Sequence, residues 1–375
     1  MKIAFLTSTP IPSKRASSIQ VMKMCQSFAG TGSEVYLLAR EGRKSEIGSS
    51  GDLFRYYGVE PIFEIRTLRP INFLGRGLMT LGLRSGWELL KLQPDLVYGR
   101  SVLSSLIAVC LGYDLILEVH TTQVLKRRAF HWLIKNGNLR YLVAISQALK
   151  TRLESVAGDV PILVAHDGAD PAPDPSGVSP PIDLSGFKDP VLIGYAGHLY
   201  PGKGGELISS LARLVPNLTF HVVGGTPDDI ERTRQDAPGN VIFHGFLPPG
   251  RMAEILSVFD ILLLPAGEQV LASGKKDDIG QVMSPLKLFE YMAVGKAILA
   301  SDLPVLREVL RQGENALLVS PRDVNGWKLA LEQLIANSGL REELGRRAKD
   351  DFLNKYTWDR RAERVLSGLN ANRAW

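Results

Sequence analysis

Residues 191–223 read VLIGYAGHLYPGKGGELISSLARLVPNLTFHVV, and this stretch decides the fold. An apolar run at 191–195 leads into a glycine-rich turn, a segment of helical periodicity at about 204–214 and a second apolar run at 218–223. Short apolar runs on either side of a helix are typical of buried parallel strands. Because parallel strands joined by a helix require a right-handed crossover, we expect a doubly wound α/β sheet here.

The same alternation extends through the rest of the chain. Lys2–Thr7, a helical stretch at 21–28 and an apolar run at 35–39 form another strand–helix–strand unit near the N-terminus. Further strands are expected at 96–98, 115–119, 141–145, 162–165, 241–243, 261–264 and 297–300. Helices of the second half are expected at about 204–214, 250–258, 285–294, 303–312, 324–336 and 340–365.

A change of composition separates two such series. Residues 168–190 contain six prolines and show no strand or helix periodicity, which indicates a semi-rigid linker at 171–190. We therefore predict a Rossmann-like domain at 1–170 and a second at 191–357, with a helix at about 358–375 packing back on the first. Two such domains facing across a cleft would bring the carboxyl ends of both sheets to it, where ligands of doubly wound folds bind.

Composition excludes several classes of protein. The 375 residues are 45% hydrophobic and 22% charged, which fits a two-domain globular protein and excludes disordered, collagen-like and coiled-coil chains. Two distant cysteines, Cys25 and Cys110, exclude a disulfide scaffold and a cysteine-rich zinc site and favour a reducing compartment. No apolar stretch approaches the roughly 20 residues of a membrane span, and the first apolar run is too short for a secretory signal. We expect a cytoplasmic protein, free or peripheral at the inner face of the membrane.

The positive charge is concentrated in the first half. Residues 1–170 carry 21 lysines and arginines against 14 acids, a net charge of +7, whereas the remainder has a net charge of −2. This asymmetry favours an anionic partner, although a solvated basic surface would give the same counts. No aromatic–basic platform for nucleic acid is present. The stretch 71–92 mixes Arg76, Arg84 and Lys91 with many apolar residues, so it is either a helix lying on an anionic bilayer or an ordinary helix covering the sheet.

The glycine-rich turn is a candidate phosphate site. Gly197, Gly202, Gly204 and Gly205 allow backbone amides to approach an anion, a helix follows, and Lys203 adds a full charge. The turn is neither a Walker A loop nor GxGxxG, so a purely structural turn remains the alternative.

A second candidate is the segment SPLKLFEYMAVGK at 284–296. Ser284 suits an N-cap and Pro285 the first helical turn, so the helix would present free amides to an anion. Glu290 would lie less than two turns inside, where a carboxylate can bind two vicinal hydroxyls of a ribose. The alternative is a capped core helix with a solvated glutamate.

Two polar groups follow strands of the first half. His120 ends the expected strand 115–119 and is either a general acid–base or hydrogen-bonding group for a substrate, or a structural histidine. His166-Asp167-Gly168 follows the last strand of this half and is either a polar turn beside the ligand or plain loop.

Taken together, these motifs resemble a known family. GYAGHLYPGKG at 194–204, HVVGG at 221–225, VIFHGFL at 241–247, SPLKLFEYMAVGK at 284–296 and a final helix through 356–358 occur in the order found in GT-B glycosyltransferases of family four, the group 1 glycosyltransferases. The resemblance covers nearly the whole chain and is strongest over 191–360. It implies a retaining transfer of a hexose-type sugar from a UDP- or GDP-linked donor, bound mostly by the second domain.

The resemblance also implies roles for individual residues. Lys203 would contact the donor diphosphate, the amides of Leu286 and Lys287 the phosphates, Glu290 the ribose, and His120 the sugar and reaction centre. The remaining candidates are Gly197, His198, Gly224 and Ser284 for the donor, and Ser17, Ser18, Asp167 and Gly168 for the acceptor side.

The chain departs from the family pattern at three places. Val282 stands where the first acid of the E-x7-E pair is expected, and its role would fall to Glu268, Asp277 or Asp278, or be absent. His198 replaces an arginine that often accompanies the donor lysine. Ser17-Ser18 replaces a Gly-Gly of the first loop.

The residues predict a reaction without metal or cofactor, because no metal-ligand cluster or DxD motif is present and Lys203 with two helix N-termini can stabilise the leaving diphosphate. The expected partners are the nucleotide-sugar donor and a hydroxyl of a glycan, lipid-linked or small-molecule acceptor, with no nucleic acid. The alternatives are a degenerate nucleotide-sugar-binding or scaffold protein and a GT-B-fold nucleotide-sugar epimerase.

Overall fold

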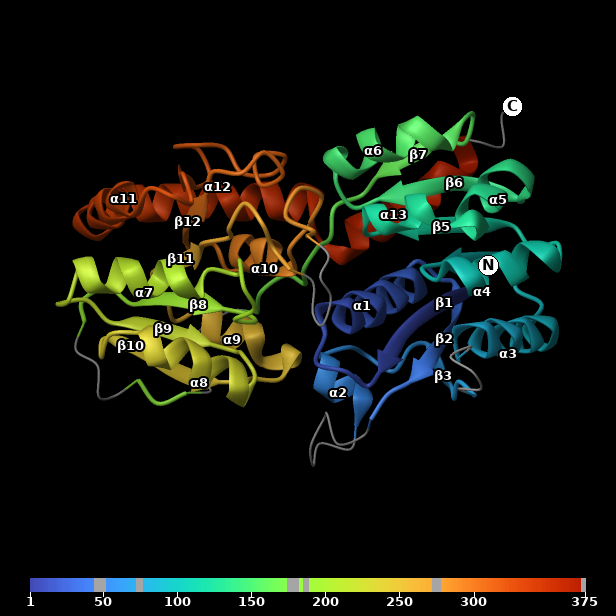
Figure 1. Ribbon diagram of the computed structural model, residues 1–375, viewed down its shortest axis with the longest axis horizontal. Coiled ribbons are helices and arrows are strands. Elements are labelled where there is room, and N and C mark those ends of the chain that lie inside the picture. Colours follow the sequence, from blue (N-terminus) through green and yellow to red (C-terminus); the bar gives the residue numbers. More distant parts are fainter. Residues whose placement is uncertain (44–51, 72–76, 174–181, 185–188, 272–277, 372–375) are drawn as a thin grey trace. The chain divides into compact units, whose positions relative to one another are not determined.

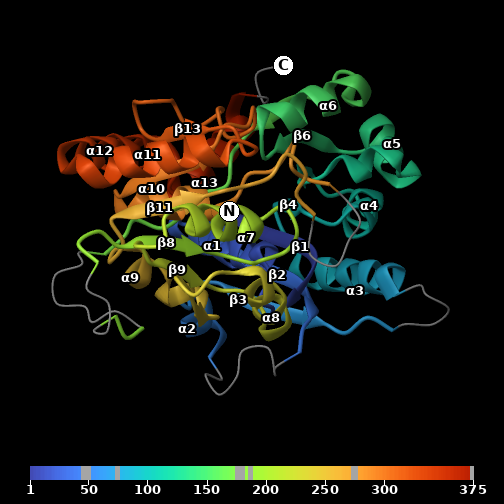
Figure 2. The same ribbon diagram turned by 60° about the vertical axis from the view of Figure 1, so that its left-hand side comes forward.

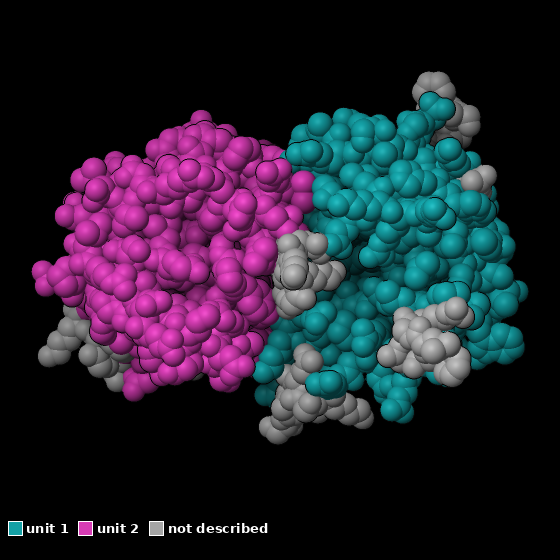
Figure 3. Space-filling model, in the orientation of Figure 1, with its two compact units in different colours: residues 1–167, 358–375 teal, residues 168–357 magenta. Residues whose placement is uncertain are grey.

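The chain divides into two compact units. The computed structural model describes residues 1–375 except 44–51, 72–76, 174–181, 185–188, 272–277 and 372–375. Unit 1 comprises Met1–Asp167 and Trp358–Trp375, and unit 2 comprises Gly168–Thr357 (Figure 3). The first boundary therefore falls slightly before residue 170.

Unit 1 is built on a seven-stranded parallel sheet. The strand order is β3-β2-β1-β4-β5-β6-β7, so the order of winding reverses between β1 and β4. All seven strands are parallel, as the strand–helix–strand alternation predicts. The strands are β1 (Lys2–Ile11), β2 (Glu34–Glu41), β3 (Glu64–Leu68), β4 (Leu96–Gly99), β5 (Leu115–Val119), β6 (Leu139–Ala144) and β7 (Ile162–Val164).

Helices cover both faces of this sheet (Figure 1). The C-terminal helix α13 packs against α1 and β6, while α3 packs against α4, and α4 against α5. Right-handed crossovers place α1 on one face and α3, α4 and α5 together on the other. The helices of unit 1 are α1 (Ala16–Gly30), α2 (Leu53–Tyr57), α3 (Gly77–Leu92), α4 (Val102–Cys110), the 3₁₀ turn η2 (Thr122–Lys126), α5 (Arg128–Asn136), α6 (Gln147–Ala157) and α13 (Trp358–Ala371).

Unit 2 repeats the design with six parallel strands in the order β10-β9-β8-β11-β12-β13. Its winding reverses between β8 and β11. In such sheets, ligands bind beside the carboxyl ends of the strands at the reversal. The strands are β8 (Ile193–Ala196), β9 (Phe220–Val223), β10 (Val241–Gly245), β11 (Ile261–Leu264), β12 (Ala297–Ser301) and β13 (Leu317–Val319).

Two apolar cores fill the faces of the second sheet. One surrounds Phe289 and Phe259, and the other surrounds Trp327 and Tyr195. Figure 2 shows the helices of unit 2 from a second direction. They are α7 (Gly205–Leu214), α8 (Pro227–Asp236), the 3₁₀ turn η3 (Pro249–Arg251), α9 (Met252–Leu256), α10 (Leu286–Val294), α11 (Val324–Ala336) and α12 (Ser338–Lys355). The prediction of two doubly wound α/β domains is confirmed.

Two expected helices differ in the structure. Residues 303–312 form successive turns, because the buried Asn315 side chain bonds the Arg311 amide and the Val309 carbonyl in place of helical partners. The helix expected at 340–365 is interrupted at Tyr356–Thr357. There the backbone pairs with Ala169, and the chain passes from unit 2 to unit 1.

No helix in the described part of the chain is both long and apolar enough to cross a bilayer.

Candidate functional site: a glycine-rich turn in unit 2 and a charge cluster in unit 1

The glycine-rich turn after β8 is held by the hydroxyl of Tyr195. This hydroxyl lies 2.7 Å from the His198 carbonyl and 3.1 Å from the Lys203 carbonyl, which it reaches as a donor. It also accepts a hydrogen bond of 2.7 Å from Nζ of Lys287 on α10. One buried phenol therefore fixes both ends of the turn and the lysine that approaches it.

Glycine is required at the point where β8 and β9 end. Gly197 and Gly224 have φ angles of 140° and 112°. A Cβ on Gly224 would lie 2.4 Å from the Gly197 carbonyl oxygen, and one on Gly197 would lie 2.5 Å from Lys287 Nζ. The two strand ends therefore meet closely, and Gly197 leaves the space that the lysine occupies.

Lys203 and Lys287 are two partly buried lysines in the described part of unit 2 whose charges act on each other. Burial lowers the pKa of Lys203 to about 8. Burial, together with the charge of Lys203, lowers the pKa of Lys287 well below its usual value, and Glu290 partly opposes this shift. Lys287 Nζ also lies 3.9 Å from the centroid of the Tyr195 ring. Two like charges held together out of water are stabilised by an anion bound between or beside them.

Helix α10 begins one residue later than its sequence suggests. Pro285, with an extended backbone, is the N-cap residue, and the helix starts at Leu286, so Ser284 is not the cap and Pro285 is not in the first turn. The first amides of the helix still have no partners within it, as at any helix N-terminus. Lys287 lies in this first turn and Glu290 one turn further on.

The three acids considered as replacements for Val282 have different surroundings. Val282 itself is buried, with 4% of its surface exposed. Glu268 forms an ion pair with Arg322, and the Asp278 carboxylate accepts hydrogen bonds from the amides of Val270 and Gly280. These two acids therefore act as structural partners of the loop, and Asp277 lies outside the described residues.

His198 stacks on Tyr200, with ring centroids 4.8 Å apart and planes 9° apart. The histidine therefore lies within the same turn as Lys203, where the family pattern has an arginine.

His120 in unit 1 contacts Arg100 and Glu118 at the carboxyl end of β5. Arg100 Nε donates to His120 Nε2 at 2.7 Å, and Glu118 forms a close contact with the same nitrogen. Burial and the neighbouring arginine outweigh the carboxylate and lower the pKa of His120 to about 4. The imidazole is therefore neutral at pH 7, which suits it to hydrogen bonding and to accepting a proton only transiently.

A cluster of buried charges holds His120 in place. Glu118 accepts hydrogen bonds from Gln20 at 2.7 Å, from Arg361 at 3.1 Å and from the Tyr98 hydroxyl. Arg361, on α13, also donates to the carbonyls of His166 and Ala165, at 2.8 and 3.2 Å. One arginine therefore links the end of β5 to the end of β7.

Asp167 and the two serines contact the same cluster. The Asp167 carboxylate lies 4.0 Å from Arg361, and burial raises its pKa to about 7. The Ser17 carbonyl accepts a hydrogen bond of 2.9 Å from Arg100. The Ser18 hydroxyl is buried at the start of α1 and donates to the carbonyls of Ser13 and Arg15 in the preceding loop, so it stabilises that loop. Gly168 is the first residue of unit 2.

The structure thus gathers the predicted residues into two groups, one in each unit. Gly197, His198, Lys203, Gly224 and Lys287 lie together in unit 2. His120, Asp167 and the Ser17 backbone lie around one charge cluster in unit 1. Sequence reasoning missed Tyr195, Arg100 and Arg361 as site residues. Arg100 lies two residues after the strand predicted at 96–98 and could have been found by that position, whereas nothing local marks Arg361.

Among the described residues, no group of three or more histidines, cysteines, aspartates or glutamates is placed to hold a metal ion.

The fold is that of GT-B glycosyltransferases. Sucrose-phosphate synthase from Thermosynechococcus elongatus superimposes with a TM-score of 0.75 at 16% identity, covering 100% of this chain and 99% of that one. Anabaena HepE in complex with UDP-glucose gives a TM-score of 0.75 at 16% identity, covering 99% of this chain and 100% of that one.

The family match lies in unit 2. Residues 190–337 match the model of the family described as glycosyl transferases group 1. The phosphatidyl-myo-inositol mannosyltransferase of Mycolicibacterium smegmatis is 28% identical over 207 residues, which are 51% of this chain and 49% of that protein. The chain thus spans about half the length of the curated relatives it matches. The predicted resemblance to group 1 glycosyltransferases is confirmed.

Proposed function

We propose that this protein is a retaining glycosyltransferase that moves a hexose from a UDP- or GDP-linked donor to a hydroxyl of a glycan, lipid-linked or small-molecule acceptor. The observation that carries the proposal is the pair Lys203 and Lys287 beside the glycine turn of unit 2. Neither lysine forms an ion pair with a carboxylate among the described residues, although each is partly buried. A diphosphate has the charge and size to be the negative partner of both lysines.

The same pair supports a reaction that needs no metal. When the glycosidic bond to the diphosphate breaks, negative charge develops on the leaving phosphate. Lys203, Lys287 and the first amides of α10 would stabilise that charge. In a front-face displacement, the leaving phosphate would then help to remove the proton of the acceptor hydroxyl.

In this proposal, Glu290 binds the ribose hydroxyls and His120 hydrogen-bonds the sugar as a neutral imidazole. The solved complexes of HepE with UDP and with UDP-glucose support a nucleotide-sugar donor for this fold. The family match of unit 2 supports the same donor class.

Thermal unfolding with UDP, GDP, ADP and their common sugars, with and without EDTA, tests the donor site. A ligand at 100 times its Kd should raise the unfolding free energy by about 2.7 kcal/mol. We expect a shift with one nucleotide, unaffected by EDTA and lost in Lys203→Ala and Glu290→Ala, while Lys328→Ala on α11 retains it. Absence of a shift with every nucleotide would refute the donor site.

The buried Val282 supports a second candidate, a nucleotide-sugar-binding protein without turnover. Both candidates predict the thermal shift, so turnover separates them. Release of the free nucleotide from the stabilising sugar donor, with an acceptor mixture present, would support the transferase. An α-linked product from an α-linked donor, seen by proton NMR, would establish retention. Binding without any release would support the second candidate.

A further inference from the structure

Helix α3 of unit 1 has several large apolar side chains on its outside. Met79, Leu83, Trp87 and Leu90 are each at least half exposed, and their spacing places them along one side of the helix. Arg84 and Lys91 are exposed beside them. These six residues are called the outward face of α3. Of the sequence stretch 71–92 that suggested such a helix, residues 72–76, with Phe73, Leu74 and Arg76, lie outside the described residues.

The inward side of α3 buries Leu81, Leu89 and Leu92 together with three small residues. Gly82, Ser85 and Gly86 are buried against α4. A Cβ would lie 2.9 Å from the Ile107 side chain if placed on Gly82, and 2.7 Å from it if placed on Gly86. Helix α3 can approach α4 this closely only because these residues are small. The buried leucines and small residues thus fill the inward side of α3, and its four exposed apolar residues take no part in that packing.

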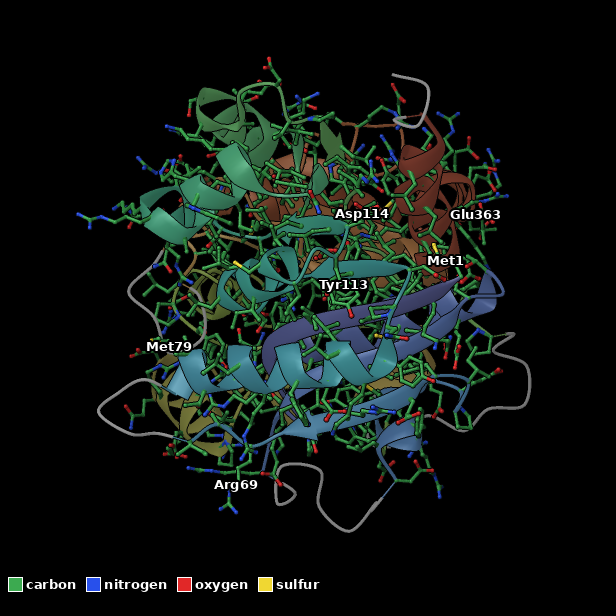
Figure 4. All side chains as sticks on the ribbon, turned by 90° about the vertical axis from the view of Figure 1, so that its right-hand side faces the viewer. Met1, Arg69, Met79, Tyr113, Asp114 and Glu363 are labelled. Carbon is green, nitrogen blue, oxygen red and sulfur yellow. The ribbon has the colours of Figure 1, made fainter. Side chains whose placement is uncertain are left out.

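The helix is also fixed in this orientation. The Tyr113 hydroxyl donates to the Leu89 carbonyl at 2.9 Å, and Thr80 Oγ1 forms hydrogen bonds of 3.0 Å with the Ile71 backbone. Figure 4 looks onto this side of unit 1, with α3 running across the view from Met79 and Tyr113 above it. The outward face is thus a firmly held surface.

Helix α3 itself carries a net charge of +1, from Arg84 and Lys91 against one acid. Glu88, the one acid in α3, is paired with Arg66 at 2.8 Å and with Lys91 at 2.9 Å, and these partners lower its pKa. Lys91 Nζ lies 5.4 Å from the centroid of the Trp87 ring, so a cation and an indole lie side by side.

Helix α5 adds a second surface of the same kind on the same side of the sheet. Arg127 and Arg128 at its start and Trp132 within it are exposed, and α5 contains no acid.

We infer that the outward face of α3, together with α5 on the other side of α4, docks on the surface of an anionic lipid bilayer. Exposed tryptophans together with lysines and arginines suit the boundary between headgroups and acyl chains. The positive charge selects anionic headgroups over neutral ones. A second copy of the chain would bring the same cations against one another, so charge disfavours it as the occupant. The inference does not depend on the proposed transferase activity.

Flotation of the full chain with lipid vesicles tests the inference. We expect binding to vesicles of equal parts phosphatidylcholine and phosphatidylglycerol, weak binding to phosphatidylcholine alone, and release as salt is raised. The double variant Leu83→Ser with Trp87→Ser should weaken binding by about tenfold or more, because it removes most of the insertable apolar surface. Arg84→Gln with Lys91→Gln should weaken binding to the anionic vesicles by about fivefold per charge.

The matched control is Leu329→Ser on α11 of unit 2. Leu329 is 66% exposed and Leu83 is 63% exposed, so both changes remove the same exposed side chain. The control should bind vesicles as the unchanged protein does. All variants should have the same melting midpoint as the unchanged protein.

Tryptophan emission gives a second readout in the unchanged protein. Trp87 and Trp132 are exposed, whereas Trp327 and Trp358 are buried, so anionic vesicles should shift the emission to shorter wavelength. The shift should be smaller in Trp87→Phe. Equal vesicle binding by the unchanged protein and by the double variant Leu83→Ser with Trp87→Ser would overturn the inference. So would absence of vesicle binding at low salt, or a dimer that the same double variant dissociates without any vesicle binding.

Discussion

The guanidinium of Arg361 lies 3.1 Å from the Glu118 carboxylate, although 243 residues separate them in the chain. Both side chains are almost fully buried. Arg361 also holds the carbonyls of Ala165 and His166, so the last helix fixes the edge of the sheet that carries His120. The geometry of the unit 1 cluster therefore depends on a segment that follows the whole of unit 2.

We predict that Arg361→Met strongly destabilises unit 1. The change leaves the Glu118 carboxylate buried without its main counter-charge, and breaking a buried pair in this way costs about 3–5 kcal/mol. Urea unfolding, monitored by circular dichroism, measures the effect. The free energy of unfolding is taken from the transition that shifts in the variant.

Arg360→Gln is the matched control, because Arg360 is the neighbouring arginine with its side chain exposed. Its effect should stay within about 0.5 kcal/mol. A change of less than 1 kcal/mol in Arg361→Met would show that water or another cation replaces the guanidinium, contrary to the buried pair described above.

The fold could be predicted from the sequence because its signals are local. Apolar runs such as 191–195 and 261–264, with helices between them, determine parallel strands. The observed β11 matches its predicted range, and β8 ends one residue beyond its own. The Arg361 contact gave no such signal, since an arginine in an amphipathic helix looks the same whether it faces water or a buried acid. The break at Tyr356–Thr357 was missed for the same reason, because it is determined by pairing with the distant Ala169.

We predict that Gly224→Ala destabilises unit 2. An alanine would need a φ near 112°, and its Cβ would lie 2.4 Å from a backbone oxygen of Gly197. Since that oxygen belongs to a turn fixed by hydrogen bonds, the combined strain should lower the unfolding free energy by about 2 kcal/mol or more. The melting midpoint measures the effect. Gly239→Ala is the control, because a Cβ there meets nothing within 4 Å and its φ is not positive. Equal midpoints for the two variants would disprove the close approach.

We predict that nucleotide binding weakens as pH rises from 7 to 9.5. The pKa of Lys203 is about 8 in the free protein, so the lysine loses its charge over this range. To bind the diphosphate as a cation, Lys203 must then first take up a proton. Above that pKa, the Kd for the nucleotide should rise by up to about tenfold per pH unit. Isothermal titration calorimetry at several pH values measures the dependence.

Lys203→Arg separates this titration from other causes. A guanidinium stays charged throughout the range, so the variant should show a flatter profile than the unchanged protein. An unchanged slope in the arginine variant would assign the pH dependence to another group, and a flat profile in the unchanged protein would place Lys203 away from the phosphates.

The arrangement of Lys203 and Lys287 could be predicted from the sequence only in part. The glycine turn and the Ser-Pro segment each indicated an anion site, and the helix that carries Lys287 was expected. The link between them through the Tyr195 hydroxyl was not foreseen, because Tyr195 lies inside an apolar strand and resembles an ordinary core residue. The role of the Tyr195 hydroxyl depends on where the side chain points at the end of the strand. The alternation of residues along a strand does not show that direction.

Acid should destabilise unit 2 through His221. Its Nδ1 lies 3.0 Å from Nε2 of His244, and burial, followed by the neighbouring histidine, lowers the pKa of His221 to about 4. The unfolded chain, with an ordinary histidine pKa near 6.5, binds the proton first. Stability is therefore complete above about pH 6.5 and is lost as pH falls toward 4, by about 2–3 kcal/mol at most for this group. Unfolding in urea at pH 7 and pH 4.5 measures the loss.

The control variant is His221→Phe, which keeps a ring against Phe259 without a titrating group, so its stability should fall less over the same interval. If the variant and the unchanged protein lose the same free energy, the acid sensitivity belongs to other groups of the chain.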